Sequence, residues 1–365
     1  MKLCVFFTGA GCPGARSIMK AFRTGARKEG RNLEIITADV DELAYGFHLA
    51  DRGFVIPPGS SPDFIPMMMD ICRKERPEFI VSAVDNELVP LSMAKKDFMS
   101  LGTGVVLAEP EAVENAVSKR KSYEIASRLG FAPDYVKVTD SGEFKEAVKQ
   151  MGFPERAVCF KPSFSYGMRG FRIIQRGKDR SRLLFEEKPG SVFADYQDIM
   201  SMFRERENRG EKLPEIMVME YLPGKEYTVD MLLKNKEPVV TIPRERVRTK
   251  QGISVIAKVE KNQEIIEASE TIAKVMGLNY NANMQFRYSE AGEPKLIEVQ
   301  PRLAGTTAAC IGAGVNLPWL GLKVAMGEPL PEIEVKWGTV MKRFWEEVFE
   351  KDGKTWFIGI RDTFM

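Results

Sequence analysis

The chain has 365 residues, too many for one core and enough for two or three packed units. With 44% hydrophobic and 28% charged residues, its composition excludes disorder and low complexity. The 53 basic and 51 acidic residues leave a net charge of +2, which indicates neither a nucleic-acid nor a membrane partner.

Several classes of site and location are excluded by what the sequence lacks. No stretch reaches the roughly 20 apolar residues of a membrane span, and the first strand runs directly into a turn pattern unlike a signal peptide, so we expect a cytoplasmic protein. The five cysteines have no CxxC spacing and are expected to be buried apolar side chains. His48, the single histidine, is expected to have a structural or surface role. Chemistry must therefore come from Lys, Arg, Asp, Glu, Asn and Gln.

Strands and helices alternate over residues 1–118, which predicts a Rossmann-like parallel α/β domain. Residues 3–8 and 33–40 are predicted strands separated by a helix. Residues 77–88 are predicted to form a further buried strand whose end carries Asp85 and Glu87. This domain is expected to contribute contacts to an acceptor substrate or to a second copy of the chain.

The turn after the first strand contains GxGxxG at Gly9, Gly11 and Gly14, and Asp39 ends the second strand. In a dinucleotide-binding protein such an acid would hold a ribose. The motif is short, however, and the preferred interpretation is a plain strand-to-helix turn. A nicotinamide or flavin site is the alternative.

The remaining chain predicts two α+β subdomains, residues 119–213 and 214–330, followed by an extension, 331–365, to which we assign no role. The first subdomain has two helices, three short strands and a very polar insertion; the second is rich in hairpins. The predicted helices are 118–130, 140–152 and 265–277. The predicted strands are 135–138, 156–161, 171–175, 215–220, 227–233, 237–243, 281–288 and 295–300.

The last two predicted strands form the most informative hairpin. If it is symmetric about the SEAGEP turn, Gln285 lies opposite Glu298 and Asn283 opposite Gln300. Strand alternation then places these four side chains on one face, and an apolar set on the other: Met284, Phe286, Ile297 and Val299. A carboxylate with amide oxygens beside Arg302 suits Mg²⁺ and phosphate. A hairpin with a solvated polar face is the alternative.

A second phosphate-binding candidate is the segment after residue 160. Lys161 ends a predicted strand, and small residues follow it: Ser163, Ser165, Gly167 and Gly170. Small residues let backbone N–H groups approach phosphates, and a lysine at the base of the loop can neutralise them. The sequence is not a Walker A motif, and an ordinary glycine turn is the alternative.

A basic strand segment, PRERVRTKQG, could reach an anionic substrate or the γ-phosphate of ATP. Alternation puts Arg244, Arg246 and Arg248 on one face if the strand continues. Arg244 and Lys250 are the candidates for catalysis. A solvated basic strand is the alternative.

The order of these motifs resembles the ATP-grasp superfamily, and within it the ATP-binding half of the carbamoyl-phosphate synthase large subunit, over residues 1 to about 327. It reads Lys119, then Lys161-Pro-Ser-Phe, GxxG, EYLPGKE from Glu220 to Glu226, Gln285-Phe, and EVQPR from Glu298 to Arg302. The resemblance implies an ATP-grasp fold whose two α+β subdomains enclose the nucleotide.

The resemblance also implies a role for each matched residue. Lys119 and Lys161 would contact ATP phosphates, the latter under a loop containing Ser163, Gly167 and Gly170. Glu220, Tyr221 and Leu222 would line the adenine pocket, and Glu226 would bind the ribose. Gln285, Glu298 and Gln300 would hold two Mg²⁺ ions, with Mn²⁺ as a substitute, and Arg302 would stabilise the transferred phosphoryl group. Relatives usually have Asn where Gln300 stands, which leaves its metal contact open.

The expected function is an ATP- and Mg²⁺-dependent carboxylate-amine ligase that releases ADP and phosphate. Its expected partners are a small carboxylate and an amine, with a homodimer as one assembly. The chain carries no duplicated half, allosteric domain or ammonia tunnel, so we do not expect it to make carbamoyl phosphate. The alternatives are an NAD(P)-dependent oxidoreductase and a non-catalytic ATP-binding protein.

Overall fold

The computed structural model describes residues 2–163, 170–187, 191–351 and 354–357, and the chain forms two compact units. The first unit comprises residues 1–117, 228–284 and 300–365, and the second comprises 118–227 and 285–299. In the part of the chain so described, no helix is long and apolar enough to cross a bilayer. The predicted four-part division stays a prediction.

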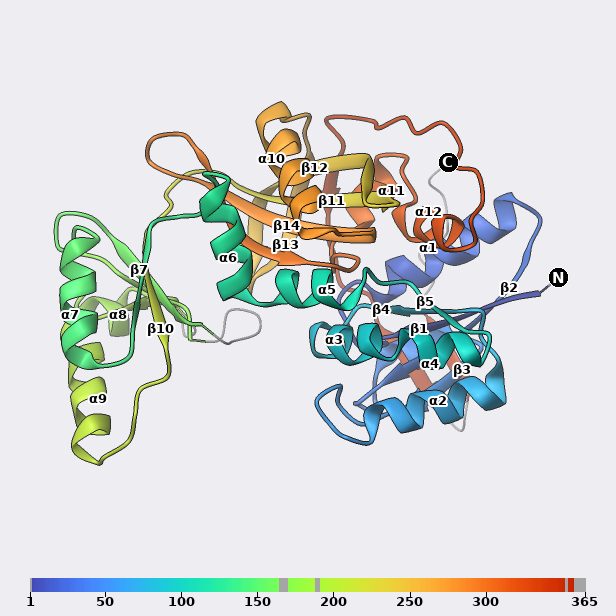
Figure 1. Ribbon diagram of the computed structural model, residues 1–365, viewed down its shortest axis with the longest axis horizontal. Helices are drawn as coiled ribbons and strands as arrows, with labels where there is room; N and C mark the ends of the chain where they lie inside the picture. Colours follow the sequence, from blue (N-terminus) through green and yellow to red (C-terminus); the bar gives the residue numbers. More distant parts are fainter. Residues whose placement is uncertain (1, 164–169, 188–190, 352–353, 358–365) are drawn as a thin grey trace. The chain divides into compact units, whose positions relative to one another are not determined.

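The first unit begins with a parallel sheet of order β3-β2-β1-β4-β5, as predicted. Its strands are β1 (Lys2–Thr8), β2 (Asn32–Asp39), β3 (Arg52–Val55), β4 (Phe79–Ser82) and β5 (Gly104–Val105). Helices α1 (Ala15–Lys28) and α2 (Phe64–Glu75) lie on opposite sides of it (Figure 1). The strand order reverses between β1 and β4, so the carboxyl ends of these strands form the crevice where such sheets bind ligands.

Helix α1 shows why this part of the sequence folds as it does. Ile18, Phe22 and Ala26 recur at helical spacing and are fully buried. Three more helices follow in this part of the unit: α3 (Asp85–Met93), α4 (Lys95–Ser100) and α5 (Pro110–Val117). The short 3-10 helix η1 (Tyr45–Leu49) contacts α1.

The prediction of a strand over residues 77–88 was wrong at its C-terminal end. Strand β4 stops at Ser82, and Asp85 and Glu87 lie in the first turn of α3. Carboxylates are favoured there because the helix macrodipole is positive at its N-terminus.

A six-stranded sheet of order β15-β14-β11-β12-β13-β16 contains the predicted hairpins. Its strands are β11 (Glu226–Lys234), β12 (Glu237–Lys250), β13 (Ile253–Val259), β14 (Tyr280–Tyr288), β15 (Pro294–Gln300) and β16 (Val340–Lys342). Helix α10 (Gln263–Met276) packs on β12, begins at the N-cap Asn262 and ends at Gly277, whose φ is 70°. Helices α11 (Ala308–Gly312) and α12 (Leu317–Ala325) contact α1, and a small hairpin of β17 (Val348–Lys351) and β18 (Lys354–Phe357) ends the described chain.

The second unit contains a sheet of order β6-β10-β7-β8-β9. Its strands are β6 (Tyr135–Val138), β7 (Val158–Pro162), β8 (Arg172–Ile174), β9 (Phe193–Ala194) and β10 (Ile216–Glu220). Helices α7 (Ser141–Gln150) and α9 (Tyr196–Asn208) pack side by side on one face (Figure 1). Tyr123 of α6 (Lys119–Arg128) packs in a separate cluster with Cys159, Met217 and Met219, and α8 (Arg180–Phe185) contacts β9.

Candidate active site

Lys161 lies on β7, and strand alternation explains its position. Val158 and Phe160 point into the core formed with α7 and α9, whereas Cys159 joins the cluster around Tyr123 on the other face. Lys161 shares that second face and is only 7% exposed. Its ammonium donates to the Tyr123 hydroxyl at 2.9 Å and lies 4.7 Å from the centroid of that ring. Lys161, which the sequence predicted to bind phosphate, is therefore a buried cation on the face of the sheet that Tyr123 covers.

The described residues around Lys161 compensate its charge only in part. Desolvation lowers the pKa of Lys161, and the negative charge of Glu298 opposes that shift only in part. In the part of the chain that the structure describes, no carboxylate forms an ion pair with this ammonium. A buried charge without a counter-ion is costly, and an anionic ligand such as a phosphate would remove the cost.

The segment after Lys161 supplies a second unsatisfied donor. Ser163 is buried, and its hydroxyl has no hydrogen-bond partner in the structure. Gly170 has a φ of +76°, and a Cβ there would lie 2.6 Å from Cδ of Pro162. Glycine is therefore required at position 170 by conformation and by space. Gly167 and Ser165 lie outside the described residues.

The predicted adenine-binding segment follows β10. The Glu220 carboxylate accepts the Asp134 N–H at 3.0 Å, Leu222 is buried, and the Arg287 guanidinium lies 5.4 Å from the centroid of the Tyr221 ring. Glu220 and Tyr221 line a hollow of about 650 Å³ in this unit. Glu226 begins β11 and is half-buried.

Lys119 is the first residue of α6, directly after the N-cap Ser118, whose side chain accepts the Lys121 N–H. A lysine in the first helical turn is unfavourable for the helix dipole, because that end is positive. The position is therefore better explained by an anionic contact than by helix stability.

The turn of the β14–β15 hairpin differs from the symmetric one expected. The Ser289 N–H donates to Glu293 O at 2.8 Å, the Gly292 N–H donates to Ser289 O at 3.0 Å, and Gly292 has a φ of 79°. This is a type I turn followed by a G1 bulge, which offsets the pairing at the turn by one residue.

Burial along the hairpin also departs from strict alternation. Met284, Phe286 and Val299 are buried as predicted, but Leu296 is fully buried and Ile297 only partly so. Leu296 and Val299 are three residues apart, so β15 does not bury every second residue. The pairing of Gln285 with Glu298 stays a prediction.

Three predicted metal ligands, Gln285, Glu298 and Gln300, are each partly exposed. In the described residues no group of three or more His, Cys, Asp and Glu side chains could hold a metal ion. One carboxylate with amide oxygens is instead a hard, oxygen-only donor set, which fits Mg²⁺ when phosphate and water supply the remaining ligands.

Asn283 does not join this ligand set in the structure. Its side-chain amide donates to Arg302 O at 2.9 Å, and thereby braces the main chain after β15. Nε of Arg302 donates to the Asp85 carboxylate at 2.5 Å, and its side chain is 12% exposed. The predicted phosphoryl-binding arginine and the acid after β4 thus meet in the first unit.

Arg244 is the most buried cation in the part of the chain described. It is fully buried; Nε donates to Asp230 at 2.5 Å and Nη1 donates to the Thr306 hydroxyl at 2.8 Å. Burial, the largest single cause, lowers the pKa of Arg244, but the charges and hydrogen bonds of Asp230 and Cys310 together make the net shift upward. Nη2 of Arg244 and the hydroxyl of Thr307 are also buried. Neither has a hydrogen-bond partner among the described residues. Unsatisfied buried donors are costly, and an anionic group would satisfy them.

The other cations of the basic segment are arranged differently from the prediction. Register shifts occur between Glu245 and Arg248 and between Arg248 and Thr249 on β12. Such bulges break alternation, so Arg248 is exposed while Arg244 is buried. Lys250 is exposed at the end of β12, with Nζ 5.7 Å from the centroid of the Trp345 ring.

Sequence reasoning missed Arg343, which lies in the extension without an assigned role. Its guanidinium donates to Pro13 O at 3.2 Å and to Gly305 O at 2.6 Å, so it ties the glycine turn to the loop that carries Thr306. Burial and the positive charge of Arg244 are among the causes that lower the pKa of Arg343, burial being the largest. No local motif marks this residue, because its partners are distant in sequence. Tyr123 was missed for the same reason.

The glycine turn uses Asp39 itself. The Gly11 N–H donates to the Asp39 carboxylate at 2.7 Å. The acid that would hold a ribose in a dinucleotide-binding protein therefore closes its own turn, which favours the plain strand-to-helix interpretation.

Two family models match this chain. One is described as PylC-like, N-terminal domain, and matches residues 9–106; the other is described as ATP-grasp in the biosynthetic pathway with Ter operon, and matches 212–345. Over residues 212–345 the chain is thus similar to ATP-grasp proteins, which agrees with the resemblance given by its motifs. The fold class predicted from the sequence is confirmed, with a parallel N-terminal sheet and antiparallel sheets beyond it.

Curated proteins similar to this chain include carbamoyl phosphate synthase large chains. That of Methanothermobacter thermautotrophicus is 24% identical over 327 residues, which cover 84% of this chain and 28% of the relative. The N-terminal section from Methanopyrus kandleri is 23% identical over 335 residues, covering 84% of this chain and 53% of the relative. The chain thus spans between about a quarter and half of the length of these relatives.

Solved structures share the fold at low sequence identity. A biotin carboxylase–β-γ-ATP complex from Campylobacter jejuni matches with a TM-score of 0.65 at 16% identity, covering 90% of this chain and 72% of that one. An ADP-bound N5-carboxyaminoimidazole synthetase from Staphylococcus aureus matches with a TM-score of 0.65 at 13% identity, covering 92% and 81%.

Proposed function

We propose that this protein is an ADP-forming carboxylate-amine ligase that uses ATP and Mg²⁺. The observation that carries the proposal is the buried ammonium of Lys161, which forms no ion pair with the described residues, together with the Ser163 hydroxyl two residues on, which has no hydrogen-bond partner among them. Such a cation requires an anionic ligand, and ATP phosphate is the ligand that the superfamily supports.

In this proposal Lys161 and Ser163 hold nucleotide phosphates, with Lys119 contributing from the start of α6. Glu220, Tyr221 and Leu222 hold the adenine, and Glu226 the ribose hydroxyls. Gln285, Glu298 and Gln300 hold Mg²⁺, which would offset charge on the phosphate oxygens when bound.

We assign Arg302 and Arg244 as the residues that bind the carboxylate substrate and the transferred phosphoryl group. A carboxylate oxygen attacks the γ-phosphorus in line, the bond to the β-γ bridging oxygen breaks, and ADP leaves. The amine then attacks the acyl carbon, phosphate leaves, and the amine loses a proton. Arginine is suited to both groups because its planar guanidinium binds carboxylate and phosphate oxygens in pairs. Lys250 stays the weaker candidate, since its side chain is exposed.

The decisive experiment is a screen of amino acids, dipeptides and small acids for ADP release, with and without an amine. A competent acid should also yield a hydroxamate when hydroxylamine replaces the amine. Release of AMP and pyrophosphate would show adenylation and would reject the proposed chemistry. ATP binding without turnover for every acid would favour the non-catalytic alternative. A cytoplasmic location and a homodimer stay predictions.

A further inference from the structure

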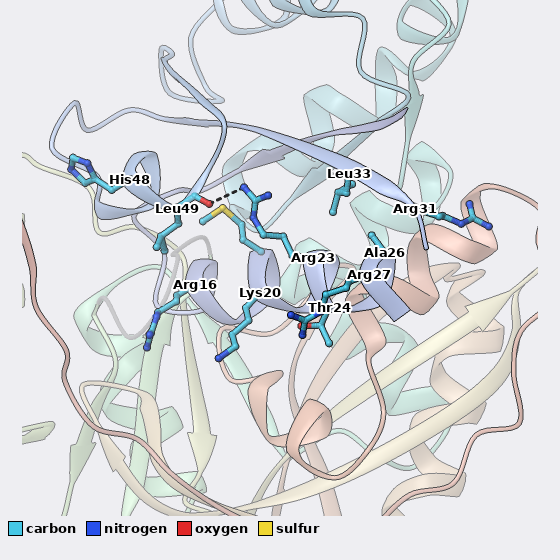
Figure 2. Close-up of a pocket in the computed structure, with 11 residues that line it drawn as sticks. Arg16, Lys20, Arg23, Thr24, Ala26, Arg27, Arg31, Leu33, His48 and Leu49 are labelled. Carbon is cyan, nitrogen blue, oxygen red and sulfur yellow. Dashed lines mark hydrogen bonds between the residues drawn. The ribbon is translucent and has the colours of Figure 1, made fainter. Parts of the chain in front are cut away.

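The outer face of α1 carries a row of cations. Arg16, Lys20, Arg23 and Arg27 are spaced by four, three and four residues, which places them on one side of a helix. They line a pocket of about 620 Å³ together with Arg31 and His48, over an apolar floor that includes Met19 and Leu33 (Figure 2). None of the described residues that line this pocket is acidic.

Paired and unpaired cations alternate along this row. Arg23 pairs with Asp51 at 3.0 Å and Arg31 with Glu328 at 2.7 Å. Lys20 and Arg27 are exposed and form no ion pair within the described part of the chain. On this face Lys20 lies between Arg16 and Arg23, and Arg27 lies between Arg23 and Arg31.

The packing of α1 does not depend on the charges of Lys20 and Arg27. The buried side of α1 already packs through Ile18 and Phe22, and the first turn of α1 contains no acid. Like charges at i, i+4 destabilise a helix by about 0.2 to 0.5 kcal/mol per pair, and a cation near the N-terminus is unfavourable for the dipole. Arg16 and Arg23 contact other parts of the chain, and Arg27 lies in the last turn of α1, where the dipole favours a cation. Neither Lys20 nor Arg27, however, neutralises a carboxylate among the described residues.

The chain's own C-terminal segment places carboxylates against one end of this face. Arg16 forms an ion pair with Glu346, and Glu350 lies 3.5 Å from His48. Two carboxylates from a five-residue stretch thus lie at one end of the row, and the cations beyond them continue along the helix at about 4.5 to 6 Å intervals. Side chains three or four residues apart on an acidic helix have the same spacing. A two-fold contact of α1 with α1 would oppose like charges, which argues against a second copy at this face.

We propose that the face formed by Lys20, Thr24 and Arg27 docks an acidic segment of a partner protein, and that this segment continues the contact begun by Glu346 and Glu350. The surface is independent of the ligase site, since none of these residues is assigned to it.

The test compares two charge-reversed forms of the full chain. One carries K20E and R27E; the control carries K145E and K149E, which makes the same charge change on exposed residues of α7. A fluorescent peptide of ten glutamates, followed by fluorescence polarisation, is the probe. We expect the K20E/R27E form to bind it about tenfold more weakly than wild type, the control to bind as wild type, and added salt to weaken wild-type binding.

A second binding measurement uses a peptide of the opposite charge. A ten-lysine peptide should bind the K20E/R27E form more tightly than wild type, and ADP release should be unchanged in that form. Three results would overturn the proposal: no binding of the acidic peptide to wild type, equal loss in both variants, or a response to inorganic triphosphate or duplex DNA but not to the peptide.

Discussion

The Lys161 ammonium donates to the Tyr123 hydroxyl at 2.9 Å, in a part of the second unit from which water is almost excluded. The tyrosine orients the cation but cannot neutralise it, because burial raises the pKa of Tyr123 well above its ordinary value and keeps the phenol protonated. The Lys161 charge is therefore available to a ligand.

Replacing Lys161 with Met should remove the phosphate contact while preserving length and packing. We expect ATP with Mg²⁺ to raise the melting temperature of the wild type clearly more than NAD does, and this stabilisation to disappear in K161M. The control is Lys149→Met on the exposed face of α7, which should behave as wild type. A larger shift with NAD than with ATP would reverse the ranking of nucleotides.

The pKa of Lys161 also predicts a pH effect on the ligand-free protein. Its folded pKa is lowered from 10.5, so in the window between the lowered value and 10.5 the unfolded chain binds more protons. Stability should therefore gain a contribution as pH rises through that window. Subtracting the melting temperature of K161M from that of the wild type at each pH isolates the contribution of Lys161 to stability. A difference that stays flat through the window would mean that the ammonium is not desolvated.

Glu87 predicts a pH effect of the opposite sign. It is 2% exposed, accepts hydrogen bonds from Thr8 and Ser82, and burial raises its pKa to about 7 from 4.5. The folded state then binds more protons between these values, so stability falls as pH rises from about 4.5 to 7, by at most about 3 kcal/mol. Thermal unfolding at pH 5 and pH 7.5 should show the fall in wild type and not in Glu87→Gln. A similar fall in the variant would assign the effect to other carboxylates.

The hairpin separates metal binding from packing. Glu298→Gln keeps the side-chain shape but removes the anion, so the fold should persist while turnover falls about 10²-fold or more and the Mg²⁺ requirement rises. Phe286→Ala should instead cost about 3 to 5 kcal/mol of stability through a core cavity, with little change in Mg²⁺ dependence. Magnesium titration of turnover in both variants measures the difference. Wild-type behaviour of Glu298→Gln would reject the metal assignment.

The Arg244–Asp230 pair allows a structural role to be distinguished from a binding role. Arg244→Met leaves the Asp230 carboxylate buried and unpaired, which should cost about 3 to 5 kcal/mol. Adding Asp230→Asn removes the unpaired charge and should restore most of the stability. If Arg244 holds the acid substrate, the double variant should regain its melting temperature but not its turnover. Recovery of both would make Arg244 a structural residue only.

Features that depend on the pattern of residues close together in the sequence could be predicted from it. Alternation along β7 placed Lys161 at the end of a buried strand, and the alternation of strands and helices gave the parallel sheet. The G1 bulge at Gly292 and the shifts around Arg248 escaped prediction because one extra residue changes register without changing composition. Arg343 escaped because its acceptors, Pro13 and Gly305, become neighbours only after folding.

The two turns joined by Arg343 also approach each other at a pair of glycines. A Cβ added to Gly14 would lie 3.0 Å from Cα of Gly305, so the main chains meet with no space for a side chain between them. An alanine at position 14 would push against a backbone rather than a movable side chain. In a directed-evolution experiment, we therefore expect variants at Gly14 to survive only with compensating changes in the loop around Gly305. Mutagenesis libraries for altering acid specificity should therefore keep Gly14 fixed.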